Sequence, residues 1–171
     1  MDASLPSQNV RSAIPWVTTV ARLVLGGVLI AAGGLKIGNP AESVVAVKAY
    51  ELLPESMATA VGYALPILEI VVGVLLVVGL LTRVAAVAGA LLMLAFVFGI
   101  AWAWARGLRI DCGCFGGGGE LGAGQEPTYL IDILRDFGLV VLGAWTARFP
   151  PGRLALDGAL GLHTVSEREN D

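Results

Sequence analysis

The sequence predicts an all-α membrane protein: a four-helix transmembrane bundle with a short interfacial amphipathic helix between the first and second spans. Composition is the first indication, because 56% of the 171 residues are hydrophobic and only 15% are charged. A soluble domain carries about 25% charged residues. The second indication is four stretches long enough to cross a bilayer, which takes roughly 20 apolar residues. These predicted spans are residues 16–35, 57–81, 83–105 and 129–149.

The spans lie in a predicted membrane domain, residues 15–150, between two tails, 1–14 and 151–171, that are expected to be flexible. The first span is not typical of a cleaved signal peptide, because it is too long for a signal-peptide core and contains Arg22. We expect Arg22 to snorkel toward the nearer membrane surface.

The loop between the first two spans predicts a helix of its own. Between Pro40 and Leu53, valines and other apolar residues alternate with charged residues, and Pro40 and Pro54 stand at the two ends, as at many helix boundaries. An amphipathic helix of this kind lies at the membrane interface. It would cap the bundle or offer a docking surface.

Glu69 falls at the centre of the second span. A carboxylate at that depth costs about 2.5–3.5 kcal/mol on insertion scales, so it should face the bundle interior with a partner or in its protonated form. Two interpretations remain open: a contact to a proton or cofactor, and an interhelical hydrogen bond that fixes the packing.

The fourth span contains Asp132, Arg135 and Asp136 near its first end. Their i,i+3 and i,i+4 spacing places them on one helix face. They should project beneath the loop that precedes the span. They form either a self-neutralising cluster or a site in which Arg135 steadies a thiolate or an anionic ligand.

The only two cysteines, Cys112 and Cys114, are one glycine apart in the long polar, glycine-rich loop before the fourth span. A disulfide in so short a ring is strained, and strained disulfides are the labile, catalytic ones. Gly113 relieves part of the strain through its wide backbone freedom. Arg109 and its neighbour Arg106 would favour a thiolate, Asp111 would oppose it, and glycines 116–119 are expected to make the loop mobile.

Two other interpretations of the cysteine pair remain open. The pair is also suited to a static disulfide. A metal site would need a second chain, because this side of the membrane offers no further cysteine and no histidine, so no metal is predicted. The net charge of −3 favours no nucleic-acid partner.

The predicted orientation of the chain in the membrane rests on redox chemistry rather than on the distribution of charged residues. Four spans put both termini on one side of the cell membrane, and lysine and arginine are almost equally divided between the two sides. A lasting disulfide belongs outside the reducing cytosol. The termini are therefore expected to be cytosolic and the Cys-Gly-Cys loop extracytoplasmic.

Three sequence patterns together resemble the MauE branch of the DoxX-like membrane protein superfamily, over about residues 16–150. They are Gly33-Gly34-Leu35-Lys36 with Asn39-Pro40; Tyr50-x3-Pro54 with Ala64-Leu65-Pro66-x2-Glu69-x3-Gly73; and Asp111-Cys112-Gly113-Cys114-Phe115-Gly116 with Leu134-Arg135-Asp136. The resemblance implies a four-helix membrane protein. It also implies motif roles for Lys36, Glu69, Cys112, Cys114 and Arg135.

MauE-type proteins are associated with methylamine utilisation, in processing or transport of a dehydrogenase subunit that contains several disulfides. This association agrees with the redox interpretation of the cysteine pair. Our hypothesis is a membrane protein, a candidate thiol–disulfide oxidoreductase, that exchanges thiols and disulfides with an extracytoplasmic thioredoxin-fold partner. Quinone-linked membrane thiol oxidases generally use two cysteine pairs, whereas this chain has one. No sequence motif supports a quinone, and no other cofactor is evident.

Two alternatives belong to other functional classes. One is a non-catalytic membrane anchor or assembly subunit of a redox complex, with a static disulfide. The other is a transporter, which would have to oligomerise to form a path; a homo- or hetero-oligomer is compatible with each alternative.

Overall fold

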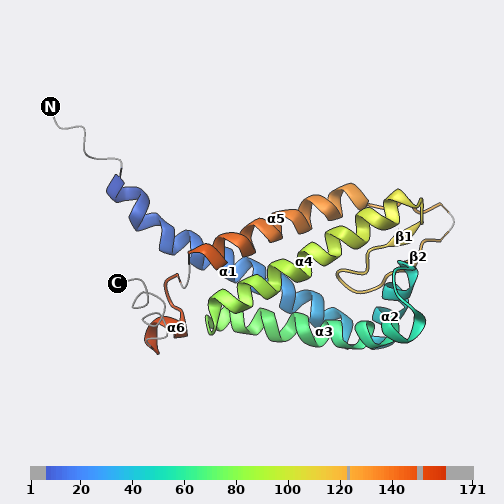
Figure 1. Cartoon of the computed structure of the whole chain (residues 1–171), viewed down its shortest axis with the longest axis horizontal. Helices are drawn as coiled ribbons and strands as arrows, with labels where there is room; N and C mark the ends of the chain where they lie inside the picture. The colour runs from blue at the N-terminus through green and yellow to red at the C-terminus, as the bar shows by residue number, and fades with distance from the viewer. Residues whose placement is uncertain (1–6, 123, 150–151, 161–171) are drawn as a thin grey trace.

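The computed structural model describes residues 7–122, 124–149 and 152–160, and the chain is mostly helical (Figure 1). Four long helices lie side by side and alternate in direction, and a short helix and a small hairpin cover one end. The elements are α1 (Ser7–Ile37), α2 (Pro40–Ala49), α3 (Glu55–Val78), α4 (Thr82–Ala105), β1 (Ile110–Asp111), β2 (Gly119–Glu120), α5 (Tyr129–Arg148) and α6 (Leu156–Ala159). We call the end with α2, β1 and β2 the loop end, and the end with α6 the terminal end.

Among the described residues, three helices are long and apolar enough to cross a membrane: Ala13–Ile37, Glu55–Val78 and Thr82–Ala105. Large apolar side chains are exposed along all three, as on surfaces that contact lipid. The prediction of a helical, multi-pass membrane protein is therefore confirmed. The fourth predicted span coincides closely with α5, and its position in the membrane stays a prediction.

Proline and glycine mark two of the helix boundaries. Pro40 occupies the first turn of α2, where its missing N–H costs no hydrogen bond. Gly79 ends α3 in the left-handed conformation, with φ of 74°, and its N–H donates to the carbonyls of Leu75 and Leu76.

Helix α2 covers part of the segment predicted to be amphipathic, but its valines do not share one face. Val44 is buried against α3, where a side chain on Gly62 would overlap it, whereas Val45 is exposed. The buried face of α2 consists of Ser43, Val44 and Ala46. The helix is confirmed, and its interfacial position stays a prediction.

Helices α1 and α3 approach closely because glycines face each other. A Cβ on Gly26 would lie 2.9 Å from the carbonyl oxygen of Gly73, and one on Gly73 would lie 2.7 Å from Ile30. Small residues permit such contacts in membranes, where apolar burial alone does not drive helix pairing. The core between the helices includes Leu25, Leu29, Val72, Leu76, Ala86, Met93 and Leu139.

Parts of both predicted tails are described by the structure, and the flexibility of the tails stays a prediction. Helix α1 begins at Ser7, inside the segment 1–14, and residues 152–160 fold back onto the terminal end. Arg22 is only 1% exposed, and its Nη2 donates to the carbonyl oxygen of Leu154 at 3.2 Å. The prediction that Arg22 snorkels to the surface is therefore wrong, because the returning chain covers it. The rest of both tails lies outside the described residues.

Asp157 ties α6 to the start of α4. Its carboxylate accepts hydrogen bonds from the backbone N–H groups of Leu81 at 2.8 Å and Thr82 at 2.7 Å. Its own N–H donates to the carbonyl oxygen of Gly79 at 2.9 Å. The carboxylate thus satisfies N–H groups that have no partner within the helix, and its charge favours the positive end of the helix dipole.

We expect Asp157→Ala to lower the free energy of unfolding by about 1–3 kcal/mol, because buried N–H donors lose a charged acceptor. Asp157→Asn, which keeps one acceptor oxygen, should cost less. Equilibrium unfolding in mixed micelles measures both variants. Equal stability of the two variants and the unchanged protein would show that this cap contributes nothing.

Candidate functional site

The cysteine loop, residues 106–128, is folded onto the loop end. Strands β1 and β2 pair antiparallel, with Ile110 opposite Glu120. Tyr129, the first residue of α5, accepts a hydrogen bond from the N–H of Ile110 at 3.0 Å and donates one to the carbonyl of Leu108. This small hairpin was not predicted by the sequence; the chain is otherwise helical, and the mobility of the loop stays a prediction.

Glycines let this loop pack on α2. Gly113 and Gly118 have φ of 65° and 103°, values that favour glycine. A Cβ on either residue would lie within 2.7 Å of the Ala46 side chain of α2. Gly113 and Gly118 therefore allow close contact with α2, and the mobility expected of glycines 116–119 stays a prediction.

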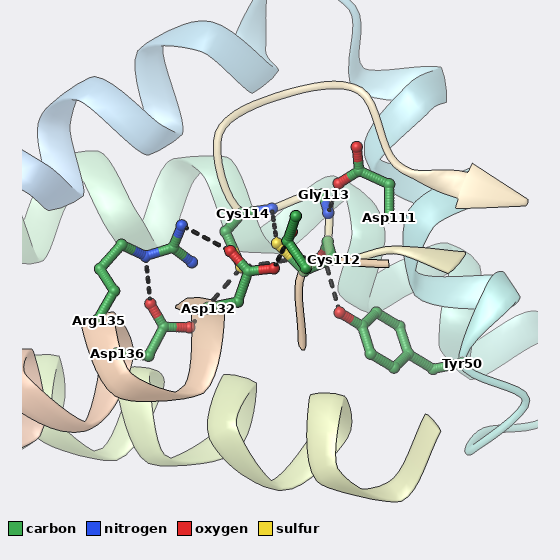
Figure 2. Close-up of polar contacts among 9 residues, drawn as sticks. Tyr50, Asp111, Cys112, Gly113, Cys114, Asp132, Arg135 and Asp136 are labelled. Carbon is green, nitrogen blue, oxygen red and sulfur yellow. Dashed lines mark hydrogen bonds and ion pairs between the residues drawn. The ribbon is translucent and has the colours of Figure 1, made fainter. Parts of the chain in front are cut away.

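The two cysteines have different surroundings (Figure 2). Cys112 is half-buried, and its sulfur accepts a hydrogen bond from the N–H of Cys114 at 3.4 Å. Cys114 is buried, with 5% of its surface exposed. Two neighbours hold the backbone: the Tyr50 hydroxyl donates to the carbonyl of Cys112 at 2.9 Å, and the Asp111 carboxylate accepts from the N–H of Gly113 at 2.9 Å.

The charged face of α5 lies directly beneath the cysteines, as its spacing predicted (Figure 2). Arg135 bridges two buried carboxylates: its Nε is 2.8 Å from Asp136 and its Nη1 is 3.0 Å from Asp132. The Cys114 sulfur donates a hydrogen bond to Oδ2 of Asp136 at 3.8 Å. The guanidinium also lies 4.8 Å from the ring centre of Phe115, so α5 and the cysteine loop form one site.

These surroundings make the two thiols unequal in acidity. The hydrogen bonds from Cys114 and Arg135 lower the pKa of Cys112, although burial and the charge of Asp132 oppose this effect. The pKa of Cys114 is raised by its hydrogen bond to Cys112, by burial and by the negative charges of Cys112 and Asp136. Cys112 is therefore the cysteine that forms the thiolate first.

Tyr50 belongs to one of the sequence patterns, but no contact between it and the cysteines was predicted. It follows α2 and reaches the cysteine loop, and burial together with the nearby thiols and carboxylates raises its pKa. The phenol therefore stays protonated and serves as a donor. The Tyr50-x3-Pro54 pattern was the available signal.

Arg109 was predicted to favour the thiolate, but its hydrogen bonds lie elsewhere. Its Nη2 donates to the carbonyl of Gln125 at 2.6 Å and to the carboxylate of Glu126 at 3.3 Å. The contacts join the beginning of the cysteine loop to its end.

Lys36 and Glu69 are joined to each other rather than to the cysteines. The Lys36 ammonium of α1 lies 2.6 Å from Glu69 Oε1 of α3, and both side chains are buried. The ammonium also lies 5.1 Å from the ring centre of Phe96. Glu69 therefore has the interhelical partner that one of its two interpretations required.

The geometry defines a class of protein: a multi-pass helical membrane protein with two unequal thiols held over a buried Arg–Asp cluster. The family model described as methylamine utilisation protein MauE matches residues 14–149. The methylamine utilization protein MauE of Paracoccus denitrificans is 33% identical over 152 residues, which cover 86% of this chain and 79% of the relative. The chain belongs to the MauE family, as its sequence patterns predicted. No solved structure matches it.

Proposed function

We propose that this protein exchanges thiols and disulfides with an extracytoplasmic thioredoxin-fold partner, through Cys112 and Cys114. The observation that carries the proposal is the inequality of the two thiols. Cys112 is the more exposed and the more acidic, whereas Cys114 is buried beside it. A nucleophile of lowered pKa next to a second, protected thiol is the arrangement that disulfide exchange requires.

In the oxidising direction for this chain, the Cys112 thiolate attacks the partner's disulfide. A mixed disulfide forms and the partner releases one thiolate. Cys114 then attacks the Cys112 sulfur, which forms the Cys112–Cys114 disulfide and releases the partner's second thiolate. The partner gains two electrons and this chain loses two; the reverse sequence oxidises the partner.

The family supplies the biological setting of the proposal. The Paracoccus relative is named for methylamine utilization, and we extend that setting to this chain. The exchange would then serve the maturation of a disulfide-containing protein of that pathway. This protein would act as an oxidoreductase whose electron partner is another protein.

The arrangement of α5 supports its placement as a fourth span. Its charged residues face the cysteine loop and the interior of the helix bundle. Leu130, Ile131, Leu134, Phe137 and Val141 are exposed on the outer side of the helix. An apolar outer face suits lipid. With four spans, both termini lie on the cytosolic side and the cysteines on the extracytoplasmic side, where disulfides persist.

Single cysteine variants test the proposal. We expect Cys114→Ser to accumulate a covalent adduct with a partner protein, because Cys112 still attacks and nothing resolves the bond. Cys112→Ser should accumulate little or none. Non-reducing gels of whole cells, followed by identification of the trapped protein, measure both.

The double variant Cys112→Ser/Cys114→Ser is the matched control for gel mobility. An impermeant maleimide should label Cys112 from outside intact cells, whereas labelling only after lysis would reverse the sidedness. If neither single variant captures a protein, and the double variant supports normal disulfide formation in client proteins, the pair is a static clip of a membrane anchor and the proposal fails.

A further inference from the structure

We propose that Asp136 is a catalytic residue that accepts the proton of the Cys114 thiol when Cys114 resolves the mixed disulfide. The inference rests on the proposed thiol–disulfide exchange and assigns a role inside it. Its basis is one contact: the Cys114 sulfur lies 3.8 Å from Oδ2 of Asp136, and both residues are buried. The Cys112 carbonyl oxygen, at 3.9 Å, is the other acceptor within reach of this thiol, and a carbonyl cannot serve as the base.

Cys114 needs a base because its surroundings keep it protonated. It is 5% exposed, so bulk water has little access to the sulfur. Its hydrogen bond to Cys112, its burial and the charges of Cys112 and Asp136 raise its pKa. Burial and the charge of Asp136 still act when Cys112 is bonded to the partner. Only a thiolate attacks a disulfide, and resolution therefore requires that a nearby group take the proton. A positioned base accelerates such a step by about 100- to 10,000-fold.

Asp136 faces the Cys114 sulfur with one of its two carboxylate oxygens. Its Oδ1 is held by Arg135 Nε at 2.8 Å, which leaves Oδ2 toward Cys114. Asp136 is 2% exposed, and the guanidinium of Arg135 is the cation that compensates the charge of its buried carboxylate.

Other charged or titratable groups at this site are committed elsewhere. Asp132 of α5 accepts from Thr128 at 2.8 Å and pairs with Arg135. Tyr50, which follows α2, donates its hydroxyl proton to the Cys112 carbonyl, and its raised pKa prevents it from acting as a base. Within the described part of the chain, Asp136 is the carboxylate that accepts a hydrogen bond from the Cys114 thiol.

Atoms and electrons balance in this step. The Cys114 S–H bond breaks and its proton moves to Oδ2 of Asp136. The resulting thiolate attacks the Cys112 sulfur of the mixed disulfide, an S–S bond forms between the cysteines, and the partner's sulfur leaves with the electron pair. The proton on Asp136 then passes to the departing thiolate or to solvent. In the reverse direction, Asp136 returns the proton to Cys114.

Dithiodipyridine tests the inference on the purified full-length protein. Attack by Cys112 on the reagent, and attack by Cys114 on the mixed disulfide that results, each release one absorbing thiopyridone. The unchanged protein should show two releases, the first from attack by Cys112 and the second from resolution by Cys114. We expect Asp136→Asn to leave the first release unchanged and to slow the second at least about 10-fold near neutral pH. The slow release should accelerate as pH rises and hydroxide replaces the missing base.

Two controls separate chemistry from packing. Asp136→Glu, which restores a carboxylate, should recover part of the second rate. In a Cys114→Ser background, alkylation of Cys112 should proceed at the same rate with and without the Asp136→Asn substitution, which shows that the change does not act through Arg135 on the attacking thiol.

The outcomes distinguish two failures. If the unchanged protein or Cys114→Ser never forms the first adduct, or if the unchanged protein never gives the second release, the proposed exchange itself fails. If both releases occur and Asp136→Asn resolves as fast as the unchanged protein, only the role of Asp136 is overturned. The role of Asp136 is also overturned if Asp136→Asn slows the alkylation of Cys112 as much as it slows resolution.

Discussion

Lys36→Met is expected to lower the free energy of unfolding by about 3–5 kcal/mol, because removal of one partner leaves a buried charge without compensation. Glu69 is 0% exposed and receives a 2.6 Å hydrogen bond from Lys36. Among the described residues, its Oε2 already has no hydrogen-bond partner. Unfolding in mixed micelles, followed by circular dichroism, measures the loss.

The double variant Lys36→Met/Glu69→Leu is the matched control. Replacement of a buried ion pair by apolar residues of similar volume is often neutral or stabilising, so the double variant should recover most of the stability that the single variant loses. If Lys36→Met is as stable as the unchanged protein, or if the double variant is no better than the single, the pair does not hold α1 to α3.

Gly33→Ala is expected to destabilise the protein by about 1–3 kcal/mol, the usual cost of an overpacked contact. A Cβ on Gly33 would lie 2.7 Å from both the Pro66 carbonyl oxygen and the Ile70 side chain. It would also lie 3.1 Å from the Cβ of Glu69, so the strain would reach the ion pair. The backbone of α3 cannot yield locally to one methyl group.

The neighbouring residue supplies the control. A Cβ on Gly34 meets nothing within 4 Å, so Gly34→Ala should be neutral or stabilise α1 by about 0.5–1 kcal/mol through its helix preference. Thermal unfolding of the two variants side by side measures the difference. Equal melting temperatures would mean that α1 and α3 separate more easily than their contacts indicate.

Short-range patterns predicted the parts of the site that share one element. Asp132, Arg135 and Asp136 lie on one face because a helix repeats every 3.6 residues, and Cys112 and Cys114 are neighbours in the chain. The same patterns did not reveal that Tyr50 reaches the cysteine loop, since that contact joins residues 62 positions apart.

Long-range pairing explains the other differences. Lys36 and Glu69 were each noted in the sequence, but their contact depends on how far α1 and α3 slide along each other. Arg22 was expected at the membrane surface, and it is buried because the segment that carries Leu154 returns to cover it. Hydropathy describes each helix separately and cannot show which distant segments come into contact.

The amino-acid sequence by itself determined the helical membrane class, because a bilayer requires every backbone polar group to be satisfied within long apolar segments. It also placed two cysteines shortly before a helix whose first turns carry Asp132, Arg135 and Asp136. Only the tertiary structure decided that Cys112 is the more exposed and more acidic thiol and that Asp136 contacts Cys114. It also decided that the glycine-rich loop packs on α2. These properties depend on burial and on distances between separate elements, and they arise only when the helices have docked.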